Sequence, residues 1–200
     1  MDKYEFKNHQ LTIKDESLDL KHEEKFDPVR IPEDLKNNLK LRDDHTLKIF
    51  RLSDGSFEYW VEKQNQLNGE YNLTHPSGKI KQQCYYNWGK LHGPSTFYSE
   101  EGNVLVKSWY IQGKQTGKCH WFYVSGKKCS TQNYLDSVWH GKQEYWYEDG
   151  TVKTIMEYQK GTVHGRVALF YPTGDLKREL FFENGSCVKE SKIDSSTGNK

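Results

Sequence analysis

The sequence has little aliphatic material and almost no net charge. Only 34% of its 200 residues are hydrophobic, and the mean hydropathy is -0.97. No apolar run approaches the roughly 20 residues of a membrane span, and the first ten residues lack an apolar signal segment. We therefore expect a cytoplasmic protein. A net charge of +1 provides no strong field for nucleic acid, so no nucleic-acid partner is expected.

Cysteines and catalytic motifs are also scarce. The four cysteines include no CxxC pair, which predicts free thiols and no zinc site. His92, His140 and His164 each precede a glycine of the repeat described below, so they recur 24 or 48 residues apart. Because neighbouring units lie about 10 Å apart in a meander, one metal ion cannot bridge His140 and His164. No phosphate-binding loop or nucleophile elbow is present, so we expect no enzyme, no cofactor and no metal.

Glycines and aromatic rings are abundant, and the glycines are periodic. The chain has 13 Tyr, 9 Phe and 6 Trp, too many rings for a disordered chain. Three sets of glycines repeat every 24 residues, with Ser137 filling one vacant place. An imperfect unit near Thr46 is one residue short and has Asn65 in the third place. The sets are Gly69, Gly93, Gly117, Gly141 and Gly165; Gly78, Gly102, Gly126, Gly150 and Gly174; and Gly89, Gly113, Gly161 and Gly185.

Each unit is predicted to be a β-hairpin. The second-set glycines end triplets such as Pro76-Ser77-Gly78, which favour a three-residue loop with a left-handed glycine. The third-set glycines are predicted to end similar turns. Successive hairpins then form an all-β, elongated, single-layer antiparallel meander of about six 24-residue repeats. The predicted boundaries are a charged arm at 1–45, the repeat array at 46–188 and a disordered tail at 189–200.

The three-residue loop also predicts which residues share a face of the sheet. It pairs Tyr98 with Val104 and Trp146 with Val152, and likewise Phe122 with Lys128 and Phe170 with Leu176. We expect the aromatic position seventeen residues after each first-set glycine, such as Tyr110, to lie on this same face. The opposite face is predicted to combine other rings with Lys81, Lys107, Lys153 and Lys177.

The repeat resembles a known family. The stretches GKQEYWYEDGTVKTIMEYQKGTVH from Gly141 and GRVALFYPTGDLKRELFFENG from Gly165 are similar to MORN repeats, in particular the bacterial variant. That variant is also similar to proteins classed as antitoxins of toxin–antitoxin systems. The resemblance covers about residues 46–188. It implies a single-layer sheet that binds other proteins or sometimes lipid, with no catalytic residues.

The face that combines rings with Lys81, Lys107, Lys153 and Lys177 is called the aromatic-lysine face. It is the candidate binding surface, since exposed Tyr and Trp supply hot spots for protein partners. We expect a non-enzymatic scaffold that binds another protein there, with an antitoxin- or immunity-like role as one form of this function. The alternative is a membrane-surface module that binds anionic phospholipid. Neither the partner's identity nor the oligomeric state follows from the sequence. The predicted partner-binding residues are Phe97, Trp109, Trp121, Tyr123, Tyr145, Tyr147 and Tyr171.

The N-terminal arm carries 12 acidic and 9 basic residues. One short helix from Ile31 to Leu41 is predicted there, with Pro32 in its first turn. Such a helix could cap the first strand, because repeat arrays need covered ends. The stretch from Lys14 to Lys25 is as well explained by a frayed arm.

Overall fold

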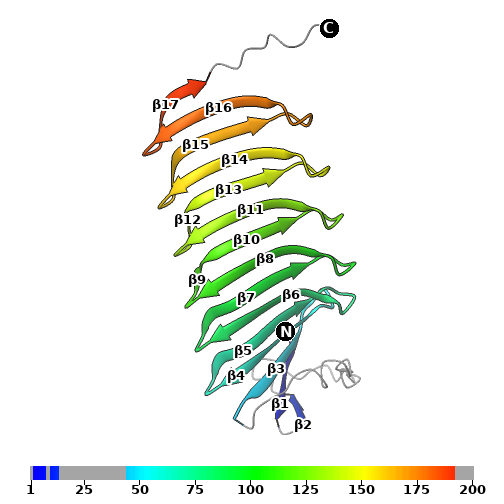
Figure 1. Ribbon diagram of the computed structural model, residues 1–200. Helices are drawn as coiled ribbons and strands as arrows, with labels where there is room; N and C mark the ends of the chain where they lie inside the picture. The colour runs from blue at the N-terminus through cyan, green and yellow to red at the C-terminus, as the bar shows by residue number, and fades with distance from the viewer. Residues whose placement is uncertain (1, 8–9, 14–43, 192–200) are drawn as a thin grey trace.

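The protein is one long antiparallel sheet. The computed structural model describes residues 2–7, 10–13 and 44–191, and every regular element in these ranges is a β-strand. The strands stack in chain order from β3 to β17 (Figure 1). Their bounds are β1 (Asp2–Lys7), β2 (Gln10–Ile13), β3 (Thr46–Arg51), β4 (Phe57–Lys63), β5 (Gln66–Thr74), β6 (Ile80–Asn87), β7 (Lys90–Tyr98), β8 (Val104–Ile111), β9 (Lys114–Gln115), β10 (Gly117–Phe122), β11 (Lys128–Leu135), β12 (Val138–Trp139), β13 (Gly141–Trp146), β14 (Val152–Gln159), β15 (Thr162–Phe170), β16 (Leu176–Glu183) and β17 (Ser186–Ser191).

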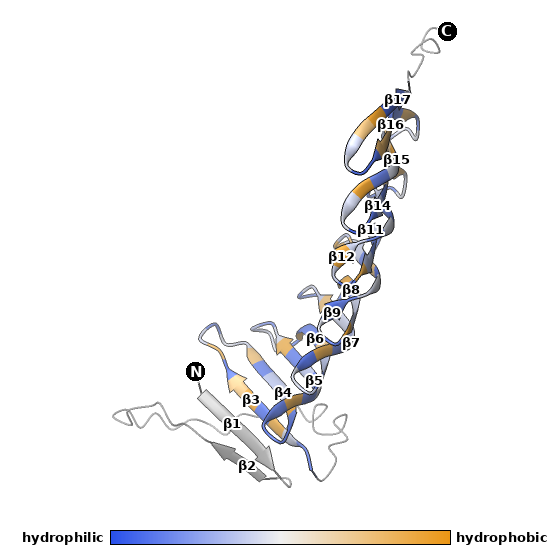
Figure 2. Cartoon of the chain, turned by 90° about the vertical axis from the view of Figure 1, so that its left-hand side faces the viewer, coloured by the Kyte–Doolittle hydropathy of each residue, from blue (hydrophilic) through white to orange (hydrophobic). Residues whose placement is uncertain are grey.

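Pairing follows the chain, as predicted for a meander. From β3 onward consecutive strands pair antiparallel, except that β9 pairs only with β8 and β12 only with β11, and β1 pairs with both β2 and β3. The short strands β9 and β12 are the first parts of broken strands. After these breaks, β10 returns to pair with β8 and β13 returns to pair with β11. Seen from the side, the array is a single layer of strands (Figure 2). The expected fold class is thus confirmed.

The hairpin tips have the predicted three-residue loops. At one such tip the Ser99 N–H donates to the Asn103 carbonyl at 2.8 Å, and the Gly102 N–H donates to the Ser99 carbonyl at 3.0 Å. Gly102 has a φ of 95°, which an L side chain rarely adopts. All four predicted cross-strand pairs, including Tyr98 with Val104, are present. The tips lie along one long edge of the sheet (Figure 1).

The turns along the other edge differ from the prediction. They are two-residue turns in which both central residues have positive φ, for example Trp88 at 48° and Gly89 at 74°. This is the type I′ pattern, whose twist matches that of the flanking strands. Ser137, which replaces glycine in the repeat, adopts a φ of 70°. The expectation of a second set of three-residue loops is therefore wrong.

A β-bulge in every full hairpin corrects the predicted faces. Tyr98 pairs with Val104, but the preceding Phe97 pairs with Val106, so Leu105 has no partner. One extra residue reverses the alternation of side chains beyond it. Tyr110 therefore shares a face with Phe97 and not with Tyr98. The same shift occurs in the other full hairpins, where the extra residues are Lys81, Cys129, Lys153 and Lys177.

The first hairpin explains its own missing residue. Its register runs without a shift from Arg51 opposite Phe57 to Thr46 opposite Glu62. Its tip has the same hydrogen bonds as the others, with the Leu52 N–H donating to the Ser56 carbonyl at 2.8 Å. The unit is one residue short because it lacks the bulge.

The ends of the chain are described in part. Strands β1 and β2 place some of the predicted arm in the sheet, beside β3. The predicted helix from Ile31 to Leu41 and the stretch from Lys14 to Lys25 lie outside the described residues. Strand β17 extends to Ser191, three residues beyond the predicted end of the array. Within the described residues, no helix is long and apolar enough to cross a membrane.

Candidate functional site

At the paired positions of β5 to β15, one face of the sheet carries no charged side chain; the bulge lysines Lys81 and Lys153 are outside these pairs, and Lys153 Nζ lies 5.5 Å from the centre of the Tyr147 ring. We call this face the uncharged face, and the pairing register defines it because directly opposed residues share a face. Rings and small polar side chains make up most of it. Its residues are Tyr71, Leu73, Gln82, Cys84, Tyr86, Ser95, Phe97, Val106, Ser108, Tyr110, Cys119, Trp121, Ser130, Gln132, Tyr134, Gln143, Tyr145, Thr154, Met156, Tyr158, Val167 and Leu169.

Side-chain contacts on the uncharged face agree with this register. The Tyr134 hydroxyl donates to Gln132 Oε1 at 2.9 Å, and Gln132 Nε2 donates to the Tyr145 hydroxyl at 3.3 Å. Tyr71 and Tyr86 make an edge contact with ring centroids 5.8 Å apart. Tyr134, Gln132 and Tyr145 therefore lie on one face of the sheet. The sequence prediction had placed Tyr134 and Tyr145 on opposite faces.

Two large rings project from the middle of the uncharged face. Phe97 is 37% exposed and Trp121 is 44% exposed, and both lie opposite Val106 on the strand between them. Tyr145 continues the row, because Ser130 pairs with Trp121 on one side and with Tyr145 on the other. Successive rings in this row are two strands apart, about 10 Å. Three of the seven predicted binding residues thus form one continuous row.

The predicted tyrosines at the hairpin tips join neighbouring repeats. The Tyr123 hydroxyl donates to the Trp146 carbonyl at 2.7 Å, and the Tyr147 hydroxyl donates to the Phe170 carbonyl at 3.0 Å. Tyr171 is 46% exposed. The hydroxyls of Tyr123 and Tyr147 thus stabilise the sheet by linking neighbouring hairpins. This role does not depend on what their rings contact.

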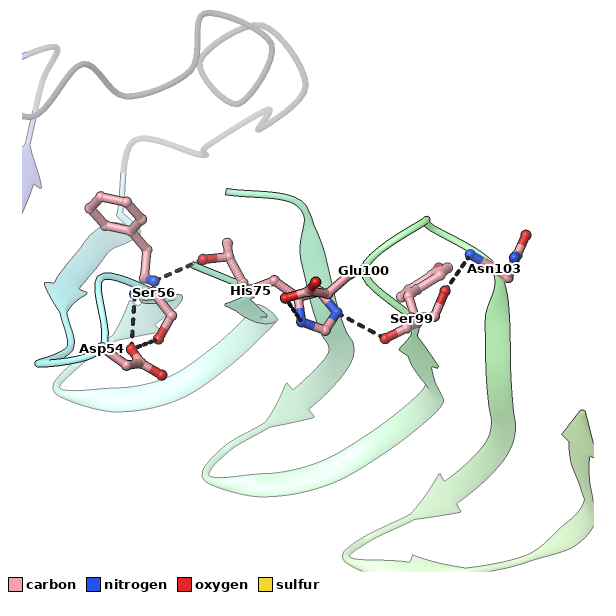
Figure 3. A network of polar contacts seen from close by, with 9 residues as sticks. Asp54, Ser56, His75, Ser99, Glu100 and Asn103 are labelled. Atoms are coloured by element: carbon pink, nitrogen blue, oxygen red, sulfur yellow. Dashed lines mark hydrogen bonds and ion pairs between the residues drawn. The ribbon is translucent and has the colours of Figure 1, made fainter. Parts of the chain in front are cut away.

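His75 makes the same connection at the start of the array. Its Nε2 lies 3.0 Å from the Tyr98 carbonyl, and its Nδ1 lies 4.0 Å from Glu100 Oε1 (Figure 3). Next to it, Ser99 is too short to reach the following hairpin, and its hydroxyl instead accepts the Asn103 N–H at 3.3 Å. The side chain at this position of the tip therefore connects neighbouring hairpins wherever it is long enough to reach a backbone carbonyl of the next one.

The opposite face, which we call the charged face, holds Trp109. Trp109 pairs with Pro94, so the bulge separates it from Phe97, Trp121 and Tyr145. It is 49% exposed. The predicted grouping of all seven residues on one aromatic-lysine face is therefore wrong. The charged face is defined by Glu70, Thr96, Lys107, Trp109, Lys118, His120, Phe122, Lys128, Thr131, Lys142, Glu144, Trp146, Glu157, Arg166 and Glu179.

The histidines before the repeat glycines support the two-residue turns. The Nδ1 atoms of His92 and His140 lie 3.4 Å from the backbone N–H groups of Gln112 and Lys160, which donate to them. His164 makes the equivalent contact with Asn184 at 3.5 Å. Among the described residues, no group of three or more His, Cys, Asp or Glu side chains could hold a metal ion.

All four cysteines are free thiols. Cys84 and Cys119 are buried in the middle of the uncharged face, whereas Cys187 is exposed. Burial raises the pKa of the Cys84 thiol to about 11 and raises that of Cys119 as well. These two side chains are therefore packing groups, not nucleophiles.

Comparison with known proteins supports the repeat assignment. No curated protein matches the sequence significantly. A family comparison matches residues 139–160 and 163–184 to the MORN repeat variant. These two segments contain most of the last two full hairpins, whose turns and bulges recur in the hairpins before them. The chain therefore contains the MORN repeat variant at residues 139–160 and 163–184, within a β-sheet whose earlier hairpins share its turns and bulges.

Proposed function

We propose that the protein is a non-catalytic scaffold that binds another protein through the uncharged face. The observation that carries the proposal is the combination of two exposed rings, Phe97 and Trp121, with a sheet face whose paired positions carry no charged side chain from β5 to β15. The centres of protein interfaces are depleted in charge and enriched in aromatic residues. Among the described residues no second layer covers this face, which leaves it open to a partner.

The row Phe97–Trp121–Tyr145 is the proposed centre of the interface. Rings at the centre of an interface lose all contact with water, and removing one typically costs about 2 kcal/mol or more of binding free energy. At this magnitude, truncation of one ring weakens binding about 30-fold. The residues paired with the three rings of the row are all uncharged, so a partner meets no charge at these positions.

Two tryptophans provide a matched test. Trp121 on the uncharged face and Trp109 on the charged face are 44% and 49% exposed, so Trp121→Ala and Trp109→Ala remove similar amounts of exposed ring. The immobilised full chain and both variants are used to capture proteins from native cell lysate, after thermal melts confirm equal folding. We expect a protein that Trp109→Ala retains and Trp121→Ala loses. Loss with Trp109→Ala alone would contradict the proposal.

Ionic strength separates this function from the phospholipid alternative. A ring-anchored protein interface should change little between low and high salt, whereas binding to anionic vesicles weakens as salt screens the charges. Binding to phosphatidylserine vesicles that Trp121→Ala abolishes would favour the membrane alternative. An antitoxin- or immunity-like role belongs to the same proposal, and it requires that the captured protein be a toxin.

A further inference from the structure

Strands β6 to β12 contain lysines but no acidic residue. Their sequences include six lysines and neither aspartate nor glutamate. The nearby acids Glu100, Glu101 and Asp136 lie in the connecting loops, where Asp136 contacts Lys114 at 3.5 Å. The middle of the array is therefore basic along the strands themselves.

Three of these lysines gather around one histidine on the charged face. Lys107 on β8 lies directly opposite His120 on β10. Lys118 is two residues before His120 on the same strand. Lys128 on β11 pairs with Phe122, two residues after His120. Alternation along the strands places all four side chains on one face. We call this set the basic cluster.

The lysines of the basic cluster have no acidic partner. Among the described residues, no carboxylate oxygen lies within 4.0 Å of Lys107, Lys118 or Lys128, although Lys128 Nζ lies 5.5 Å from the centre of the Trp146 ring. His120 Nδ1 contacts the Thr131 hydroxyl at 3.0 Å. Burial first, and then these three lysines, hold the pKa of His120 below its usual value. The positive charge at this place is therefore not neutralised within the sheet.

The rest of the charged face is arranged differently. Lys142 contacts Glu144 at 2.6 Å, and Arg166 contacts Glu179 at 2.7 Å. Glu144, which pairs with Thr131 on the strand next to the cluster, is thus already engaged. Like charges on opposed strands destabilise a sheet. The basic cluster brings like charges together on neighbouring strands and has no ion pair with a described residue to offset their repulsion. Such a departure from the pairing seen in the rest of the face is a candidate for function.

We propose that the basic cluster docks an acidic peptide segment of a partner protein. Charge complementarity is the argument, since carboxylates are the groups that would neutralise three unpaired lysines on one surface. Strands β8, β10 and β11 span about 10 Å, which about three residues of an extended chain cover. Three lysines are fewer than the four to eight basic residues typical of anionic lipid recognition. This docking site lies on the face opposite the uncharged face and does not depend on the function proposed for that face.

The test uses a fluorescein-labelled hexaglutamate peptide and the full chain, with labelled hexaglutamine as the neutral probe. We expect hexaglutamate to bind, hexaglutamine not to bind, and the double variant Lys107→Gln/Lys118→Gln to lose at least tenfold in affinity. The matched control is Lys90→Gln/Lys160→Gln, which removes two positive charges from the turn edge of the sheet. It should change affinity less than twofold.

Three results would overturn the inference. The first is equal binding of hexaglutamate and hexaglutamine. The second is an equal loss in both double variants, which would show attraction to net charge instead of a site. The third is binding to phosphatidylserine vesicles that Lys107→Gln/Lys118→Gln abolishes while hexaglutamate binding is unchanged. Retention by this double variant of a partner that Trp121→Ala loses would keep the two faces separate.

Discussion

Replacing Gln143 tests how the sheet closes a gap in its backbone pairing. Gln143 is fully buried, and its side chain lies where β12 and β13 are interrupted at His140. Its Oε1 accepts the Asn133 N–H at 2.8 Å, and its Nε2 donates to the Asn133 carbonyl at 3.1 Å and to the Gly141 carbonyl at 3.2 Å. One amide side chain thus takes the place of a backbone pair.

The expected cost of Gln143→Leu follows from these contacts. The Asn133 N–H loses its acceptor, and an unsatisfied buried donor costs about 1–3 kcal/mol. The Asn133 carbonyl still accepts the His140 N–H at 3.0 Å, so it adds little. A leucine of similar size keeps the packing. We therefore expect a loss of about 2 kcal/mol of unfolding free energy, equivalent to about 4–8 °C in Tm for a chain of this length.

The matched control is Gln132→Leu. Gln132 lies on the same face, but its partners are the hydroxyls of Tyr134 and Tyr145, which are half-buried and can bind water instead. We expect its melting temperature to fall by less than half as much. Because repeat arrays need not unfold in one step, exchange of the Asn133 amide hydrogen provides a local measurement. Unchanged exchange at Asn133 in Gln143→Leu would refute the proposed role.

Three further predictions concern strain, reactivity and pH. Gly69→Ala should destabilise more than Gly78→Ala in chemical denaturation, because both need positive φ but only at 69 would the new Cβ meet Val61, at 3.2 Å. A thiol reagent at pH 8 should label Cys187 first and Cys84 only on unfolding, and rapid labelling of Cys84 would contradict its burial. His120 has a lowered folded pKa, so the unfolded chain binds its proton more readily and stability should fall as pH drops through about 6.5. In His120→Asn this part of the pH dependence should vanish. If the Tm of His120→Asn depends on pH between 5 and 8 just as that of the unsubstituted chain does, the lowered pKa is contradicted.

The sequence was sufficient for the parts of the fold that depend on local geometry. A glycine after two turn-forming residues requires a left-handed conformation, and this predicted the loop at Gly102 and the pair Tyr98–Val104. The period of 24 then extended that hairpin along the chain. The type I′ turns were missed because Trp88 and Lys160 adopt positive φ without being glycine or asparagine. The positive φ of Trp88 and Lys160 is required by the register of the neighbouring strands and not by the type of residue.

The candidate site was predicted in part, and the bulge explains the division. Phe97, Trp121 and Tyr145 do form one row, since their spacing of 24 repeats the same place in each hairpin. Trp109 was placed with them by counting through Leu105 as if the strand were regular. The basic cluster was missed for the same reason, because the regular count placed Lys107 and Lys128 on opposite faces.

One bulge per hairpin decides what each face of the sheet can bind. Without Leu105 and its equivalents, the rings at Phe97 and at Tyr110 would lie on opposite sides, and both faces would be mixtures of rings and lysines. With the bulge, rings and small polar groups collect on one face, and the charged residues at paired positions of β5 to β15 lie on the other. The sequence does contain a signal for this, because the first unit is one residue short and has an unshifted register. The difference between 23 and 24 residues is the bulge itself, so comparing unit lengths within an array indicates where its faces exchange.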